Sequence, residues 1–280
     1  MFKRMVALAL ILMLGACALA EVASGDETVE AQEVVEAGMV PMGGEMLRDG
    51  VYPVAVNSSS SMFKIVDCVL TVQDGQMRAT MTMSGTGYLK LFMGTGEAAL
   101  AASEAETIPF EEDAEGVHRF TVPVPALDAP VDCAAFSKRK EKWYERKLLF
   151  RADSLPLEAF AEGALTTAAS LELADGLYTV DARLVGDAGK AKVESPAQLR
   201  VENGEAYATV VWGSKKYADM RLCGAPAAAL ENGGNAAFEA CVPCFDWNLG
   251  VTIDSTALGA PVEMAYALRF DSASIAPENP

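Results

Sequence analysis

The strongest constraint on this chain is an internal repeat, because a chain that repeats itself builds one structure twice. Residues 49–54 read Asp-Gly-Val-Tyr-Pro-Val, and 126 positions later residues 175–180 read Asp-Gly-Leu-Tyr-Thr-Val. Residues 70–80 share the pattern Leu-x-Val-x-Asp/Asn-Gly-x-x-x-Ala-Thr with residues 199–209. Several matches in the same order indicate duplication of one structural unit, with length differences confined to loops.

The later matches extend the repeat over most of the chain. Residues 120–128 and 238–246 both read Phe-x-x-x-Val-Pro and both end in aspartate. We therefore expect two tandem domains, at residues 49–156 and 175–277, joined by an interdomain linker at 157–174.

The pattern within each unit is typical of β-structure. In the first unit an alternation of apolar and polar residues follows Asp74-Gly75, and in the second a similar alternation follows Asn203-Gly204. These dipeptides are strong hairpin signals, because both turn positions need a positive φ. Short strands in units of about 100 residues favour an all-β fold of two tandem immunoglobulin-like β-sandwich domains.

The composition excludes several classes of protein. The 22 Lys+Arg against 39 Asp+Glu give a net charge of −17, whereas a nucleic-acid-binding protein needs a basic surface. The single histidine, His118, excludes a histidine-based zinc site and allows at most one histidine-dependent catalytic dyad. No nucleophile and base are organised around it in the sequence. We therefore expect a binding protein and not an enzyme, with no nucleic-acid partner.

The first 20 residues predict export. Lys3 and Arg4 precede a ten-residue apolar run, and small residues follow, which is the layout of a signal peptide and is too short to span a bilayer. Two processing sites fit: Cys17 ends a lipobox-like Leu-Gly-Ala-Cys and would be lipidated, and Ala20 ends an Ala-Leu-Ala cleavage site. Residues 21–48 read as an acidic linker. The protein is thus expected at the cell surface, either secreted or membrane-anchored through an N-terminal lipid alone.

The cysteines fit an oxidising compartment. A Cys68–Cys133 disulfide is expected in the first unit, where closing the loop would stabilise the folded state by roughly 4 kcal/mol. In the second unit Cys223 is expected to pair with Cys241 or with Cys244, and one thiol is left over. The Cys-x-x-Cys spacing of the last two is a poor metal site, because residues three apart in a strand point to opposite faces.

One segment of the first unit contrasts with the acidic remainder. Residues 138–147 hold six of the 22 basic residues, and Trp143 and Tyr144 lie among them. Such a segment is either an anion-attracting patch with a stacking surface or a solvated hairpin whose charges protect an edge strand. The thioethers of Met62 and Met93 are candidate soft metal ligands.

The second unit resembles a NEAT (near iron transporter) domain. The order Asp-Gly-x-Tyr-x-Val, Leu-x-Val-x-Asn-Gly and a final Tyr-Ala-Leu-Arg-Phe-Asp spans residues 175–277. The first unit resembles it more loosely and has Ser-Ser-Met-Phe at residues 60–63, where NEAT domains carry a short helix over the haem. The first unit is also similar to the Cys-containing tandem surface modules of gut clostridial lipoproteins, through Ser-Ser-Met-Phe and the segments 87–94 and 133–140. The two tyrosines four residues apart that bind haem in NEAT domains are absent from this chain.

The resemblance implies a surface protein that binds haem or serves an iron transporter component. The alternative is an adhesin that binds cell-wall or host glycan, with Trp143 or Trp212 as its aromatic surface. The sequence leaves open whether one or both units bind. The candidate ligand-binding residues are Ser61, Met62, Phe63, Tyr88, Phe92, Met93, Lys138, Arg139, Lys140, Trp143, Tyr144 and Tyr266.

Overall fold

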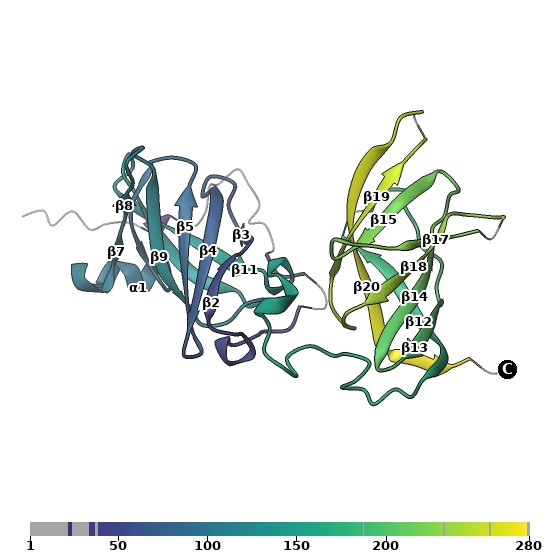
Figure 1. Ribbon diagram of the computed structural model, residues 1–280. Helices are drawn as coiled ribbons and strands as arrows, with labels where there is room; N and C mark the ends of the chain where they lie inside the picture. The colour runs from purple at the N-terminus through teal and green to yellow at the C-terminus, as the bar shows by residue number, and fades with distance from the viewer. Residues whose placement is uncertain are drawn as a thin grey trace, which may run out of the picture.

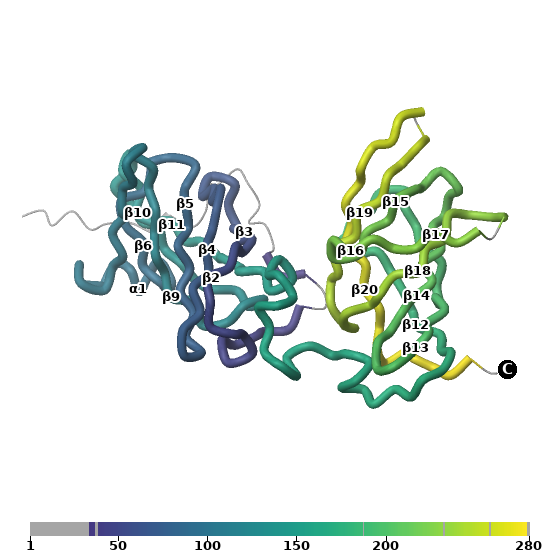
Figure 2. Tube along the Cα trace, in the orientation of Figure 1, coloured from purple at the N-terminus to yellow at the C-terminus, as the bar shows by residue number. Residues whose placement is uncertain are grey.

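The computed structural model describes residues 22–23, 34–36, 39–186, 188–231, 233–257 and 259–278. Within these ranges the regular structure is nearly all β, and the all-β prediction is confirmed. The strands form two groups that lie side by side (Figures 1 and 2), which we call the N-terminal unit (β1 to β11) and the C-terminal unit (β12 to β20). No helix in the described ranges has the length and apolar character needed to cross a membrane. The predicted signal peptide lies outside the described residues.

The N-terminal unit is a sandwich of two sheets. Apolar side chains from both sheets meet in one core, which includes Leu70, Met81 and Phe120 from one sheet and Leu148 and Phe150 from the other. The first sheet has the order β2 (Gly50–Pro53), β4 (Ile65–Gln73), β5 (Gln76–Met83), β9 (His118–Val124), β8 (Glu111–Glu112). The second has the order β1 (Val22–Ala23), β11 (Lys142–Phe150), β10 (Val131–Ser137), β6 (Tyr88–Phe92), β7 (Ile108–Pro109), and β3 (Val56–Ser58) also pairs with β11.

Short helices connect these strands. Helix α1 (Gly96–Ala101) begins after Thr95, whose hydroxyl accepts a hydrogen bond from Ala98 N at 3.2 Å and so caps the first turn. The remaining helices are single 3₁₀ turns: η1 (Gly44–Met46), η2 (Glu104–Glu106), η3 (Ala152–Ser154) and η4 (Leu157–Ala159).

The C-terminal unit is one nine-stranded antiparallel sheet around a second core. Trp212, Leu268 and Phe270 are fully buried in this core. The strand order is β16 (Ala225–Pro226), β15 (Tyr217–Leu222), β19 (Leu249–Ser255), β20 (Val262–Pro277), β12 (Gly176–Val185), β13 (Ala197–Glu202), β14 (Glu205–Val211), β18 (Ala237–Val242), β17 (Ala228–Leu230).

Both predicted hairpins are present. Asp74-Gly75 connects β4 to β5, and Asn203-Gly204 connects β13 to β14, with φ values of 51° and 71° in the first turn and 54° and 78° in the second. The side chains of Asp49 and Asp175 accept hydrogen bonds from Asp74 N and Asn203 N at 2.9 and 2.8 Å. The repeated residues thus make the same local contact in both units.

The repeat also ends in the same way. Asp128 and Asp246 both have a positive φ, and their backbone N–H groups donate to the carbonyl oxygens of Phe150 and Phe270, each at 2.8 Å. These bonds place the last long strand of each unit, β11 and β20, in equivalent positions. Phe150 and Phe270 are therefore structural counterparts.

The segments outside the two repeats belong to the cores. Met42 and Leu47 are buried in the N-terminal core, so the folded part begins within the stretch expected to be an acidic linker at 21–48. Phe160 and Ala168, in the stretch expected to be an interdomain linker at 157–174, are buried in the N-terminal and C-terminal cores respectively. A few buried apolar residues thus attach both of these stretches to the cores.

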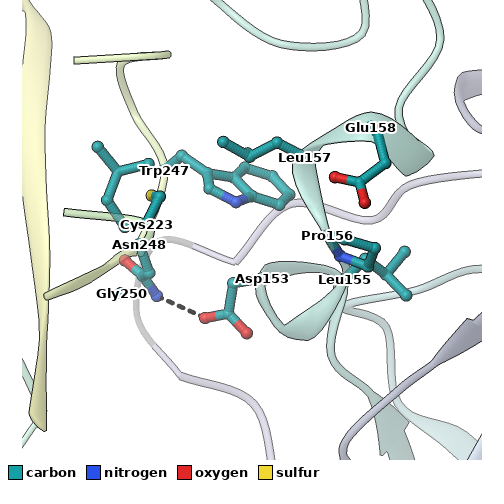
Figure 3. Close-up of a pocket in the computed structure, with 10 residues that line it drawn as sticks. Asp153, Leu155, Pro156, Leu157, Glu158, Cys223, Trp247, Asn248 and Gly250 are labelled. Carbon is teal, nitrogen blue, oxygen red and sulfur yellow. Dashed lines mark hydrogen bonds between the residues drawn. The ribbon is translucent and has the colours of Figure 1, made fainter. Parts of the chain in front are cut away.

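A compact joint connects the units. Trp247 packs against both cores and meets the Phe160 ring edge-on at 5.2 Å between centroids. Asn248 Nδ2 donates to Asp153 Oδ2 at 2.9 Å, and these groups, together with Leu157, border a cavity of about 280 Å³ (Figure 3).

Asp128 gives the N-terminal unit a predicted pH dependence. Asp128 is 7% exposed, and its carboxylate accepts a hydrogen bond from Ala152 N at 2.9 Å and lies near Arg151, Asp153 and Glu36. Burial, which is the main cause, raises the pKa of Asp128 to about 6, above the ordinary value of about 3.9. Between these values the folded state binds the proton more tightly than the unfolded state, so this group adds stability as the pH falls through 6 and loses it as the pH rises.

We expect Asp128→Asn to remove this dependence, since asparagine is neutral throughout and keeps an oxygen to accept from Ala152 N. The free energy of unfolding, measured in urea at pH 4.5 and pH 7.5, should favour the variant by about 2 kcal/mol more at the higher pH. An equal difference between variant and wild type at both pH values would contradict the assignment.

Candidate functional site

Three predicted binding residues lie next to Arg146 in the N-terminal unit, and we call these four side chains the Arg146 cluster: Phe63, Tyr88, Tyr144 and Arg146. The Phe63 and Tyr88 rings lie 5.1 Å apart. Arg146 Nη2 donates to the Tyr88 hydroxyl at 3.4 Å, and the guanidinium carbon lies 5.3 Å from the centre of the Tyr144 ring. The cluster joins residues from β6, β11 and the loop before β4.

Strand β11 directs Arg146 inward. Side chains alternate between the two faces of a strand, and Leu148 and Phe150 on the same face are fully buried in the core. Arg146 is accordingly only 5% exposed. It belongs to the basic segment 138–147, which the sequence predicts to lie on the surface. The alternation of side chains, counted back from Phe150 and Leu148, would have predicted that Arg146 points toward the core.

The buried guanidinium is incompletely paired. Nη1 donates to the carbonyl oxygen of Glu145 at 2.7 Å, and Nε has no hydrogen-bond partner. No residue in the described ranges forms an ion pair with Arg146. A buried charge without a counter-charge is strongly unfavourable, and a buried polar group without a partner costs roughly 1–3 kcal/mol.

The Ser-Ser-Met-Phe segment covers this end of the sandwich. Ser59 N donates to the Lys147 carbonyl oxygen at 2.9 Å, which holds the turn at 60–63 beside β11. Phe63 is fully buried, whereas Ser61 and Met62 are exposed, Met62 by 63%. The turn therefore offers one apolar side chain to the interior and one to solvent.

Two other predicted aromatic residues, Phe92 and Trp143, lie on the opposite face of the same sheet. Trp143 is buried with Ala99 of α1 and meets the Phe136 ring at 5.2 Å, with Phe92 packed beside them. Lys90 Nζ lies 5.4 Å from the centre of Phe136 and 5.7 Å from that of Trp143. The structure thus divides the predicted site between two faces of one sheet.

The remaining predicted residues are separate from the Arg146 cluster. Lys138, Arg139 and Lys140 are exposed in the β10–β11 turn, and Met93 packs against the N-terminal core. Tyr266 is in the C-terminal unit, where its hydroxyl donates to Met264 Sδ at 3.4 Å and its ring lies 5.7 Å from that of Trp212. Burial, and next the neighbouring Tyr217, raise the pKa of Tyr266.

His118 has a structural environment. It is buried, stacks on Phe110 with ring centres 3.8 Å apart, and its Nδ1 donates to the Tyr88 carbonyl oxygen at 3.2 Å. The ring therefore supports the backbone of β6 behind the Arg146 cluster. Across the described ranges, no group of three or more His, Cys, Asp or Glu side chains is arranged to hold a metal ion.

All five cysteines of the described ranges are free thiols, so the structure does not contain the bridges expected for Cys68, Cys133, Cys223 and Cys241. Burial is the main cause that raises the pKa of Cys68, Cys133 and Cys244, each to about 12. Cys223 and Cys241 are exposed. Cys17 lies outside the described residues. Pairing in an oxidising compartment stays a prediction.

Two hollows lie away from the Arg146 cluster. The cavity at the joint has apolar walls from Leu155, Leu157 and Trp247, and its polar groups Asp153 and Asn248 bond to each other (Figure 3). A second hollow, of about 480 Å³, lies in the C-terminal unit between β15 and the β17–β18 hairpin. Neither holds a charged group that is both buried and unpartnered, which distinguishes them from the Arg146 cluster.

Comparison with known proteins gives little guidance. No protein-family model and no curated protein matches the chain. Two solved structures match part of it: the NEAT5 domain of IsdX2, a B. anthracis haemophore in complex with haem, at 17% identity, and a point mutant of the same domain with haem, at 18%. Each match covers 35% of this chain and 97% of the other, with a TM-score of 0.30. A TM-score this low decides neither the fold nor the ligand.

The thiol environments predict an order of chemical modification. In the reduced, folded protein, we expect iodoacetamide at pH 8 to label Cys223 and Cys241 first, because the thiolate is the reactive form and the other three thiols are buried with high pKa values. Peptide mapping by mass spectrometry at successive times measures this order. Early labelling of Cys68 or Cys133 would contradict the described core, and labelling in urea provides the control.

Proposed function

We propose that this protein is a non-catalytic, exported binding protein that takes haem at the Arg146 cluster of its N-terminal unit. The observation that carries the proposal is Tyr144, which is half-buried, whose hydroxyl has no hydrogen-bond partner in the described ranges, and whose ring centre lies 5.3 Å from the guanidinium carbon of Arg146. Tyrosine oxygen is a known protein ligand of haem iron, and a nearby cation balances the charge of a phenolate bound to iron.

The surroundings suit the rest of such a ligand. Met62, which is 63% exposed, supplies apolar surface in the turn that ends at Phe63, and the exposed basic turn with Lys138, Arg139 and Lys140 attracts the anionic edge of haem in an otherwise acidic protein. The glycan-binding alternative has less support, because Trp143 and Trp212, its proposed aromatic surfaces, are 5% and 0% exposed.

The C-terminal unit is a weaker candidate for the same role. The pKa of Tyr266 is raised, which disfavours a phenolate, and its hydroxyl already bonds to Met264. We propose that the two cores form tandem domains of which the first binds the ligand. Anchoring through Cys17 and delivery of haem to an iron transporter component complete the proposal and rest on the sequence alone.

We expect haemin added to the purified protein to give a Soret band typical of a protein-bound haem. Tyr144→Phe should weaken binding at least tenfold, because it removes the oxygen that would bind iron and little else. Tyr207→Phe is the matched control, since that hydroxyl bonds to Glu205 on the exposed face of the other unit. Absorption titration at micromolar protein measures both.

Two outcomes would overturn the proposal. A flat spectrum with wild-type protein would exclude haem binding. Loss of the band in Tyr266→Phe but not in Tyr144→Phe would move the site to the C-terminal unit.

A further inference from the structure

We infer that Arg146 recognises a carboxylate of the bound ligand, so that the protein selects porphyrins with free propionates over their esters. This inference takes from the proposed function only that the ligand is a porphyrin. It adds which group of the ligand is recognised, and it assigns that recognition to a residue of the basic segment 138–147, which the sequence predicts to be either an anion-attracting patch or a solvated hairpin.

The buried guanidinium of Arg146 is incompletely hydrogen-bonded within the protein. Arg146 is 5% exposed, its Nε has no partner, and its bond to the Tyr88 hydroxyl is long at 3.4 Å. A buried cation is tolerable when an anion pairs with it, and the described residues provide none. Arginine presents a planar set of donors that matches the two oxygens of a carboxylate.

The C-terminal unit has an uncharged residue at the position equivalent to Arg146. Phe150 and Phe270 are counterparts, and the residues four positions before them are Arg146 and Tyr266. Tyr266 fills the position with a neutral ring that packs against Trp212 and Tyr217. The fold is thus built with an uncharged side chain here, and the charge of Arg146 is not required for it.

Lys147, the basic residue next to Arg146 in the sequence, is already paired. Lys147 Nζ forms an ion pair with Asp132 at 2.7 Å on the solvent side of β11. The exposed lysines of the β10–β11 turn add long-range attraction but are solvated. Arg146 is therefore the basic group of this region that gains most from an incoming carboxylate, because its charge is the one removed from water.

The test compares metal-free protoporphyrin IX with its dimethyl ester, by fluorescence titration in a buffer with non-ionic detergent. We expect wild-type protein to bind the free acid at least tenfold more tightly than the ester. Arg146→Met should abolish that difference by weakening only the free acid, and Arg146→Lys should restore part of it. Lys147→Met removes the same charge from the same strand and should leave the preference unchanged.

Melting of the unliganded variants gives an independent readout. Because Arg146→Met replaces an unpaired buried charge by an apolar side chain of similar length, we expect it to melt at or above the wild-type temperature. A clear fall would mean that the arginine is structural and would overturn the inference. Equal wild-type affinity for acid and ester, or equal weakening of both in Arg146→Met, would overturn it as well.

The outcomes separate this inference from the proposed function. If the free acid binds through Arg146 but haemin gives no Soret band sensitive to Tyr144→Phe, the iron-ligand proposal fails and the carboxylate inference stands. If haemin binds through Tyr144 and esterification has no effect, the reverse holds. If wild-type protein binds neither porphyrin, both fail.

Discussion

Strand β11 can direct only every second side chain toward the N-terminal core, and the properties of that unit depend on this constraint. The apolar residues at its C-terminal end, Leu148 and Phe150, must be buried, because they fill the space between the sheets. The same alternation then brings Arg146 inside and leaves Trp143 on the other face, under α1. A one-residue shift would exchange the two faces, removing Leu148 and Phe150 from the space between the sheets and turning Trp143 toward it.

The two units are joined by packing as well as by the chain. Phe160 belongs to the N-terminal core and Trp247 contacts both cores, so the edge-on contact between their rings connects the two sets of buried residues. The Asn248–Asp153 hydrogen bond lies beside it, and Asp153 is also paired with Arg151 at 2.8 Å.

Much of the fold was predictable because its signals are local. Asp74-Gly75 and Asn203-Gly204 specify tight turns through the conformations that these residues tolerate, and both turns formed. Boundaries were less predictable, because burial depends on distant partners: Leu47 lies in an acidic stretch yet pairs with Phe160, more than a hundred residues away. The candidate site was also hard to predict, because burial of its residues depends on distant partners. Composition marked 138–147 as basic, but only the core positions of β11 show which of its charges is buried.

The two copies also show how a duplicated fold acquires differences at equivalent points. At the turn before the last strand, the Asp246 carboxylate accepts hydrogen bonds from both the backbone N–H and the hydroxyl of Ser272. The equivalent Asp128 accepts from the backbone of Ala152, which has no hydroxyl. Four residues before the equivalent phenylalanines, the C-terminal unit has Tyr266 and the N-terminal unit Arg146. At both points the N-terminal copy retains a buried ionisable group, Asp128 with one backbone donor and Arg146 with an unpartnered Nε. Because the C-terminal copy has a tyrosine at the position equivalent to Arg146, the shared fold does not require a charge there.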